Sequence, residues 1–270
     1  MTAVSELEED ALEAAASAQA PLKRDLVAGL EKGLAVIEAF DQERPRLTIS
    51  QVAERTGLTR AAARRYLLTL MHLGFVSQDR KMFALTPRVL SLGQSYLHSA
   101  RLPRIVEPEL NKLAMTLKEA SAAGVLDGFD VVVVAAATAG RMHVPSMQPG
   151  KRVPAHCTSI GRVLLAALPP EQINAWLAPE ALVAHTPNTI MQPERLRMEI
   201  ARARAQGYAC TDQEFTPGLR SIAVPLHNHR GDVAAAMNLC VPAARMGMEE
   251  MVDQCLPILL QTQAHLKVLL

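Results

Sequence analysis

The feature that most constrains the fold is a pair of short helix patterns, each ended by a glycine, with two strand patterns directly behind them. Residues Thr48–Gln51 have the spacing of a capping box, in which a threonine and a glutamine cap each other's free backbone N–H groups. They predict a helix over Ser50–Thr56 that ends at Gly57, and a second helix follows over Arg60–Leu73. Two helices joined by a short glycine-containing turn predict a helix-turn-helix unit.

Two apolar-alternating runs follow this unit. They cover Phe75–Gln78 and Met82–Leu85 and enclose the charged residues Asp79–Lys81, so they predict a β-hairpin with a charged tip, which we call the wing. Residues 26–86 are therefore expected to form a winged helix-turn-helix domain. Its first helix is predicted over 26–41, from the helical spacing of Leu30, Leu34, Ile37 and Phe40.

The second helix of the helix-turn-helix unit carries two different faces. One face of this helix carries arginines, which can bond phosphates or the edge of guanine. Small alanines lie between the arginines and let the helix backbone approach a groove of DNA, and the opposite face is apolar. Paired arginines are also common on solvated helix faces, but their place on this unit favours DNA. The apolar face, expected to pack on the other helices, consists of Ala63, Leu67, Leu70 and Met71. The predicted DNA-binding residues are Thr48, Ser50, Thr59, Arg60, Ala61, Ala62, Arg64, Arg65, Arg80 and Lys81.

The charge distribution supports this interpretation. The chain has 28 Lys and Arg against 27 Asp and Glu, a net charge of +1 that by itself indicates no partner. Residues 1–20 hold five acids and no base, whereas residues 21–100 hold 12 bases and 7 acids. We therefore expect a disordered acidic tail over 1–25 ahead of a basic domain. The aromatic content of 3% argues against single-strand binding by base stacking, so double-stranded DNA is the expected nucleic acid.

The cysteine pattern and the start of the chain indicate the compartment. Four widely spaced cysteines form no C-x-x-C pair, so neither a zinc cage nor a disulfide framework is expected. The chain starts without the pattern of a signal peptide, and no apolar run approaches the length of a membrane helix. We expect a cytoplasmic protein with no membrane span, no cofactor and no metal ion.

The second half of the chain mixes helix and strand patterns. Residues 87–102 are expected to form a linker helix that Pro103 breaks, and a candidate dimer seam on it consists of Leu90, Tyr96 and Leu97. Residues 103–270 are expected to form an α+β domain around an antiparallel sheet, because strand patterns follow one another through hairpins and helices lie at both ends. The expected strands lie near 123–126, 131–134, 142–146, 221–226 and 233–241.

Several blocks of the sequence resemble one family of proteins. The run Leu58-Thr-Arg-Ala-Ala-Ala-Arg-Arg65, within longer matches at 28–40 and 47–70, resembles the amino-terminal domain of IclR-type bacterial transcription regulators. The resemblance continues in three later blocks and is closest to the branch that regulates aromatic catabolism through the β-ketoadipate pathway, the protocatechuate and para-hydroxybenzoate regulators. It implies a GAF-like carboxy-terminal domain that binds a small carboxylate effector, either an aromatic acid or a β-ketoadipate-like compound. The later blocks are 154–166, 212–225 and 234–242.

The helix expected at Ser159 offers this effector a candidate site, because hydroxyl groups and free N–H groups at a helix start suit a carboxylate. Arg141, Arg152 and Arg220 are the cations that would complete it. The resemblance also carries pocket positions over to this chain, in which Cys240 stands where the family more often has a hydroxyl. The predicted effector-binding residues are Arg141, Met142, Pro145, His156, Thr158, Ser159, Ile160, Thr211, Glu214, Leu219, Arg220, Ser221, Asn238 and Cys240.

Less specific roles stay open for several of these residues. Arg220 can pair with Glu214 as a structural salt bridge, and Arg152 can be a solvated turn residue. Cys157, like Cys240, can be a small buried apolar group.

The whole chain also has alternative interpretations. The adjacent His156 and Cys157 would suit a Cys/His-dependent hydrolase, although no catalytic residue is expected, and a ligand-binding module without DNA binding is a further alternative. The histidines of His227-x-His229 would suit a metal ion, but solvated turn histidines are favoured. The favoured hypothesis is a homodimeric or tetrameric regulator that reads an inverted repeat, with RNA polymerase as a further candidate partner. The sequence leaves activation and repression open.

Overall fold

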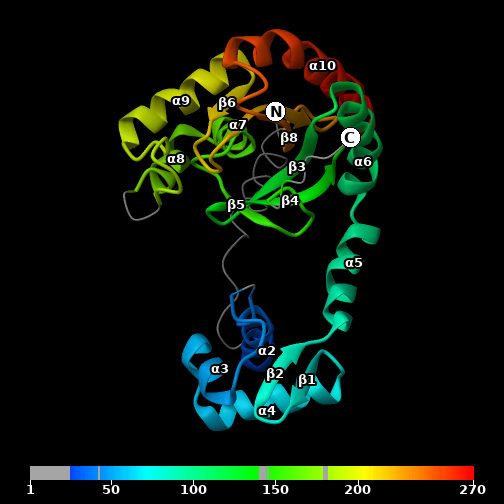
Figure 1. Cartoon of the computed structure of the whole chain (residues 1–270), viewed down its shortest axis with the longest axis vertical. Coiled ribbons are helices and arrows are strands. Elements are labelled where there is room, and N and C mark those ends of the chain that lie inside the picture. The colour runs from blue at the N-terminus through cyan, green and yellow to red at the C-terminus, as the bar shows by residue number, and fades with distance from the viewer. Residues whose placement is uncertain (1–24, 42, 140–143, 145, 179–181) are drawn as a thin grey trace, which may run out of the picture. The chain divides into compact units, whose positions relative to one another are not determined.

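The computed structural model describes residues 25–41, 43–139, 144, 146–178 and 182–270, and it divides into two compact units between Leu92 and Gly93. Figure 1 colours the first unit blue to cyan and the second green to red. Apart from Asp25, the expected acidic tail lies outside the described residues.

The first unit is the predicted winged helix-turn-helix. The predicted capping box is present: the N–H of Gln51 donates to Thr48 Oγ1 at 3.3 Å, and the N–H of Thr48 donates to Gln51 Oε1 at 2.8 Å. Gly57 ends the helix Ile49–Thr56 with a φ of +67°, in the left-handed region that favours glycine. The elements, shown in Figure 1, are α2 (Ala28–Glu38), α3 (Ile49–Thr56), α4 (Arg60–His72), β1 (Val76–Asp79) and β2 (Met82–Leu85).

The three helices and the hairpin of this unit share one apolar core. Leu30 and Leu34, whose spacing contributed to the prediction of this helix, lie outside the core, because α2 turns Gly33 toward Tyr66 of α4 and leaves the two leucines 64% and 47% exposed. The prediction that Met71 packs in the core is wrong, because Met71 is 36% exposed. Each helical residue turns the chain by about 100°, so the position next to the buried Leu70 lies at the edge of the core. The buried residues are Val36, Ala39, Leu47, Val52, Ala53, Ala63, Leu67, Leu70, Val76 and Phe83.

The helical segment after the wing breaks earlier than predicted. A 3-10 turn (Pro87–Val89) leads into α5 (Leu90–Ser99), and Ala100 then takes an extended conformation before α6 (Arg101–Leu117) begins. Pro103 therefore does not break the helix. It lies in the first turn of α6, where the missing backbone N–H of proline costs no intrahelical hydrogen bond.

The second unit is built around a six-stranded sheet in the order β5-β4-β3-β8-β7-β6, in which every neighbouring pair is antiparallel. The predicted α+β class is confirmed, whereas the strand expected near 142–146 lies mostly outside the described residues. The strands are β3 (Ala120–Asp127), β4 (Asp130–Ala137), β5 (Arg152–Pro154), β6 (Ala209–Asp212), β7 (Leu219–His227) and β8 (Val233–Pro242).

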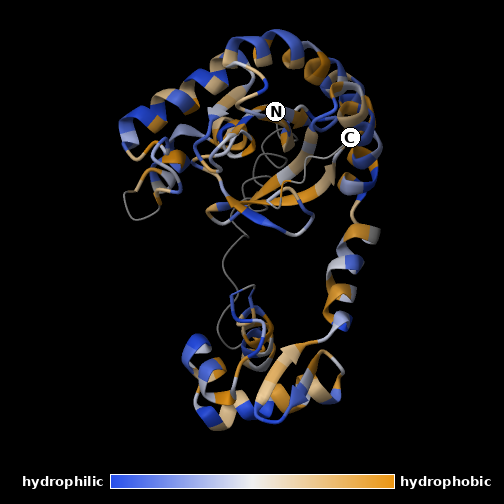
Figure 2. Cartoon of the chain, viewed as in Figure 1, coloured by the Kyte–Doolittle hydropathy of each residue, from blue (hydrophilic) through white to orange (hydrophobic). Residues whose placement is uncertain are grey.

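Helices cover both faces of this sheet. One face packs against α6 and α10 (Met248–Leu269), and the other against α7 (Ser159–Ala167) and α9 (Pro193–Gln206), with α8 (Pro170–Trp176) beside them (Figure 1). Figure 2 shows the strands as mostly hydrophobic and α9 as mostly hydrophilic. No helix among the described residues is both long and apolar enough to cross a membrane.

Side chains alternate between these two faces along β8, which decides where polar groups can gather. Met237, Leu239 and Val241 are buried in the cluster under α6 and α10. Asn238 and Cys240 occupy the intervening positions and therefore point to the α7 side of the sheet.

Candidate functional site

The predicted DNA-binding face of α4 is exposed. Arg60, Ala61, Arg64 and Arg65 all lie on the surface of the first unit, whereas Ala63, Leu67 and Leu70 of the same helix are buried. Within the described part of the chain, the three arginine side chains make no hydrogen bond or ion pair. Their charges are therefore not neutralised by neighbours and are available to an anion from outside the unit.

The remaining predicted DNA-binding residues lie at the starts of α4 and α3 and on the wing. Thr59 caps α4, and its Oγ1 accepts the N–H of Ala62, itself partly buried, at 3.2 Å. Arg80 and Lys81 are exposed at the tip of the wing, where Arg80 has a φ of +55°. Ser50 lies exposed in the first turn of α3 and Thr48 caps that helix, so hydroxyl groups mark both helix starts.

A small cavity of about 50 Å³ lies in the second unit, on the α7 side of the sheet. The strand register brings its polar wall together, because Thr211 pairs with Ser221 and Ser221 pairs with Cys240 across three neighbouring strands. The predicted residues that line it are Thr158, Ile160, Thr211, Glu214, Leu219, Ser221, Asn238 and Cys240. The lining residues that the sequence did not indicate are Ala122, Val133, Val144, Ser146, Met147, Val153, Cys157, Phe215 and Thr216.

Asn238 in this cavity and Ser159 beside it each have a buried polar atom without a partner among the described residues. Asn238 donates its Nδ2 to Cys240 Sγ at 3.5 Å, but its Oδ1 accepts no hydrogen bond from the described residues. Ser159 at the start of α7 is fully buried, and its Oγ has no partner there either. A buried polar atom without a partner costs about 1–3 kcal/mol, so these two atoms indicate a place for a ligand or an ordered water.

The start of α7 is held close to the segment before it. Thr158 caps the helix: its Oγ1 accepts the N–H of Gly161 at 3.3 Å and donates to the carbonyl of Pro154 at 2.8 Å. A side chain at Gly161 would overlap the backbone of Ala155, so only glycine permits this approach. The first turn of α7 therefore lies directly against the Ala155–Cys157 segment.

The predicted cations do not complete the site. Arg220 pairs with Asp212 at 2.9 Å and donates to the carbonyls of Ala243 and Met246, so the pairing with Glu214 is wrong. The register explains the difference, because Asp212 lies directly opposite Arg220 on neighbouring strands.

The other predicted positions lie elsewhere. Arg152 is exposed, as its solvated alternative expects, but it lies on β5 and not in a turn, and it pairs with Asp127 and, at 3.0 Å, with Asp130. Arg141, Met142 and Pro145 lie outside the described residues. His156 is buried beside the cavity; burial lowers its pKa, and its Nε2 lies 3.0 Å from the carbonyl oxygen of Val183.

A buried ion pair closes one side of the cavity. Arg162 of α7 is 2% exposed and donates its Nη1 to Glu214 Oε1 at 2.8 Å, while its Nη2 pairs with the second carboxylate oxygen. Burial raises the pKa of Glu214, and the neighbouring guanidinium opposes that shift. The sequence signal for this residue is a lone charge in Ser159–Ala167, a helix that is otherwise uncharged.

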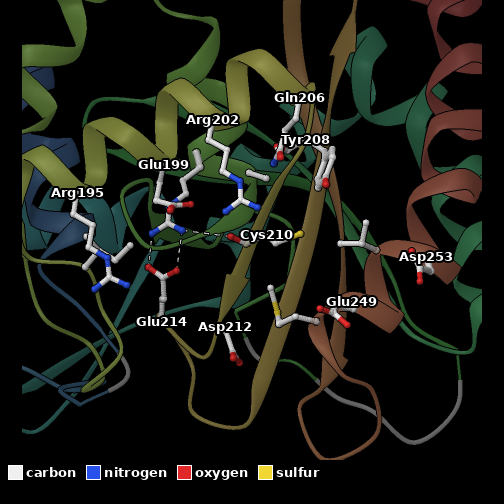
Figure 3. Close-up of a pocket in the computed structure, with 15 residues that line it drawn as sticks. Arg195, Glu199, Arg202, Gln206, Tyr208, Cys210, Asp212, Glu214, Glu249 and Asp253 are labelled. Carbon is white, nitrogen blue, oxygen red and sulfur yellow. Dashed lines mark hydrogen bonds and ion pairs between the residues drawn. The ribbon is translucent and has the colours of Figure 1, made fainter.

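The same ion pair also lies on an open groove, which Figure 3 shows. Side chains of α9 and β6 form one side of the groove, and the start of α10 forms the other (Figure 3). Glu214 lines both the cavity and the groove, so it lies in the wall between them.

The geometry does not favour an activated cysteine. Cys157 is fully buried, and burial raises the pKa of its thiol to about 12, so the reactive thiolate is scarce at neutral pH. Cys210 and Cys240 have their pKa values raised to about 12 by the same effect.

Together, an unneutralised arginine face on a winged helix-turn-helix and a polar cavity in an α+β unit define a DNA-binding transcription regulator with a ligand-binding domain. Residues 29–80 match the IclR helix-turn-helix domain, and residues 94–267 match the family described as bacterial transcriptional regulator IclR C-terminal. The chain belongs to the IclR family of bacterial transcriptional regulators.

Two curated relatives are similar over nearly the whole chain. The Pca regulon regulatory protein of Pseudomonas putida is 40% identical over 243 residues, which cover 90% of this chain and 84% of that protein. The p-hydroxybenzoate hydroxylase transcriptional activator of Acinetobacter baylyi is 40% identical over 253 residues, which cover 90% of this chain and 92% of that protein.

Two solved structures are similar as well. The crystal structure of a Rhodococcus sp. RHA1 protein described as a transcriptional regulator has a TM-score of 0.79 and 42% identity, and covers 91% of this chain and 98% of that one. The inducer-binding domain of the Acinetobacter PobR transcription factor, a double mutant in complex with 3-hydroxybenzoic acid, has a TM-score of 0.60 and 32% identity. Its match covers 63% of this chain and all of that domain.

Proposed function

We propose that this regulator controls genes of aromatic-compound catabolism and responds to a small carboxylate, an aromatic acid or a β-ketoadipate-like acid, bound in the cavity of its second unit. The observation that carries the proposal is the pair of unpartnered buried polar atoms, Asn238 Oδ1 and Ser159 Oγ, beside the start of α7. The names of the curated relatives and the hydroxybenzoate bound to the similar inducer-binding domain support the choice of ligand class.

The carboxylate is expected at the amino-terminal end of α7. Helix starts carry free N–H groups and a partial positive charge, both of which stabilise an anion. Ser159 supplies a hydroxyl donor there, and Thr158 holds the turn in place. The apolar wall of Val133, Met147 and Leu219 would contact the remainder of the ligand, while Asn238 would bond a second polar group.

The exposed face of α4 is expected to enter the major groove of DNA. Arg60, Arg64 and Arg65 would contact bases and phosphates, and the wing residues Arg80 and Lys81 would contact the flanking backbone. The protein would bind an inverted repeat as a homodimer or tetramer, in the cytoplasm where the DNA is, with RNA polymerase as a further partner.

Exposed apolar side chains support self-association. Leu90 and Tyr96 of α5 are 70% and 47% exposed, and with Leu97 they form the proposed dimer seam. The leucines of α2 at positions 30 and 34 are exposed in the same way. Apolar side chains gathered on exposed helices are typical of a face that a partner covers.

Ligand and DNA binding would be coupled through the populations of two arrangements of the protein. The coupling needs no catalysis, and the raised pKa of Cys157 supports a binding function over a hydrolase.

A thermal-shift screen of small acids tests the ligand class. Benzoate, 4-hydroxybenzoate, protocatechuate and β-ketoadipate would be compared with benzamide, which has the ring but no carboxylate. A ligand at about 100 times its dissociation constant stabilises the folded state by about 2.7 kcal/mol. We expect at least one acid to raise the melting temperature and benzamide to leave it unchanged. An equal response to benzamide would contradict the carboxylate site.

A further inference from the structure

Three metal-ligating side chains converge beside the cavity. The donor atoms of His156, Cys157 and His185 all lie within 4.8 Å of one another. Two of them come from the segment before α7, and the third comes from the loop after α8. The sequence indicated His156 as an effector-binding residue and the pair His156 and Cys157 as a candidate base and nucleophile, and it gave no role to His185.

The segment that carries His156 and Cys157 is held firmly. Gly161 lets it lie directly against α7, as described above. The carbonyl of Val183 can only accept a hydrogen bond, so Nε2 of His156, 3.0 Å away, is the protonated ring nitrogen. Nδ1 then carries the free lone pair. Histidine ligands of metal ions commonly donate their other ring nitrogen to a carbonyl in this way.

The loop that carries His185 is also anchored. Its backbone N–H donates to Thr189 Oγ1 at 3.0 Å, and Thr189 in turn donates to the carbonyl of Glu214 at 2.7 Å. Thr186 donates to the carbonyl of Gln213 at 2.7 Å. The ring of Phe215 packs edge-on against the imidazole of His185, with 5.1 Å between the ring centroids.

We propose that His156, Cys157 and His185 bind one divalent ion of the zinc class at the wall of the cavity. Two imidazoles and a thiolate are a donor set that Zn²⁺ and Co²⁺ favour, and a tetrahedral ion bound by three side chains keeps one position for water or another ligand. Tetrahedral ligands lie about 3.5 Å apart. The three donor atoms, all within 4.8 Å of one another, would therefore draw closer around the ion, and His185 is the exposed side chain among them. Binding converts the Cys157 thiol to a thiolate and releases its proton to solvent.

Nearby charges permit a cation at this place. Among the described residues, the cationic side chain of Arg162 acts electrostatically on both His156 and Cys157, and it is already paired with Glu214. That pair is neutral as a whole, so it neither repels nor replaces the ion. Because Cys157 also lines the cavity, the ion would lie next to the effector, and this consequence rests on the proposed function. Binding of the ion itself does not depend on whether the cavity binds an effector.

Titration of the full-length protein with Co²⁺, under reducing conditions and without DNA or effector, tests the site. We expect one ion per chain, with the near-ultraviolet absorption of a cobalt–thiolate bond and the visible bands of a tetrahedral complex, both removed by added Zn²⁺. Cys157→Ser should abolish the near-ultraviolet band. His185→Ala should weaken binding at least tenfold, and because His185 is exposed this variant should fold normally.

Matched controls use the other candidate ligands of the chain. Cys210→Ser and the double variant His227→Ala/His229→Ala should bind Co²⁺ like the wild type. The proposal would be overturned by the absence of a cobalt–thiolate band in the wild type, by its persistence in Cys157→Ser, or by its loss in either control. The circular dichroism spectrum shows whether Cys157→Ser folds. If it does not fold, the His185→Ala variant decides the test, and an unchanged affinity of that variant for Co²⁺ overturns the proposal.

Discussion

Arg162 and Glu214 form an ion pair that is almost fully excluded from water, although 52 residues separate them in the chain. Arg162 lies on the first turns of α7, at whose start we place the effector carboxylate, and Glu214 lies in the cavity wall. Thr186 and Thr189 both donate hydrogen bonds to the carbonyl of Glu214, which fixes its backbone as well. The pair therefore ties α7, the end of β6 and the following loop to one another.

Removal of one partner should destabilise the second unit strongly. Glu214→Leu leaves the Arg162 guanidinium buried and uncompensated, which typically costs about 3–5 kcal/mol. The double variant Arg162→Met/Glu214→Leu removes both charges and should regain most of that loss. Urea unfolding monitored by circular dichroism measures all three proteins.

An exposed ion pair serves as the control. Asp127→Ala removes one partner of Arg152, whose side chain is 47% exposed, and should change the free energy of unfolding by about 0–1 kcal/mol. If Glu214→Leu and Asp127→Ala lowered the free energy of unfolding equally, burial of the Arg162–Glu214 pair would have no energetic role.

Gly161→Ala should destabilise the protein because the new methyl group would overlap the backbone of Ala155. Overpacking of this kind costs about 1–3 kcal/mol. Gly93→Ala is the matched control, since nothing lies within 4 Å of a side chain there and alanine favours the helix by up to about 1 kcal/mol. A Gly161→Ala protein as stable as Gly93→Ala would mean that α7 does not need this close approach.

The sequence predicts the first unit well because the signals are local. The capping box at Thr48, the left-handed Gly57 and the wing each depend on a few consecutive residues. The spacing in the sequence did not identify the buried face of α2, because its burial depends on Tyr66, a residue of another helix. The spacing of apolar residues in a helix identifies candidate faces for burial, but the partner helix decides which face is covered.

Non-local pairing limits the prediction of the cavity. The resemblance identifies Thr211, Ser221 and Asn238, and the strand register brings all three to the cavity wall. Their role in effector binding stays a prediction. The partner of Arg220 was not predictable, because the register of β6 and β7 decides that Asp212 lies opposite it. The partner of Glu214 was not predictable either, because it depends on how α7, which carries Arg162, packs against the loop after β6.

The Arg220–Asp212 pair should make stability depend on pH in the acid range. The hydrogen bond from Arg220 lowers the pKa of Asp212 below its ordinary value of 3.8. A carboxyl group whose pKa is lowered on folding stabilises the protein above its unfolded pKa, and this contribution is lost as the pH falls through the folded pKa. Asp212→Asn should therefore be less stable than the wild type at pH 7, and the difference should shrink below about pH 4. A difference that stays constant from pH 7 to pH 3 would contradict the lowered pKa.

Arg64→Ala and Arg65→Ala should each weaken DNA binding without changing the affinity for an effector. A lost base contact costs about 1–3 kcal/mol, which is roughly 5- to 150-fold in affinity. A lost phosphate contact also reduces the salt dependence of binding by about one unit of slope. Fluorescence anisotropy with DNA from the region upstream of the gene measures both. Arg230→Ala, an exposed arginine of the second unit, is the control and should bind like the wild type. Native affinity in both α4 variants would disprove the proposed recognition face.

The central claim is that the cavity holds a carboxylate effector, and isothermal titration calorimetry of the acid selected by the thermal-shift screen tests it most directly. The wild type should bind one molecule per chain. Asn238→Leu, which replaces the unpartnered Oδ1 by an apolar group of similar size, should raise the dissociation constant at least tenfold, because a hydrogen bond to a polar ligand group is lost. Equal affinity in the wild type and in a folded Asn238→Leu variant would show that the effector binds outside this cavity.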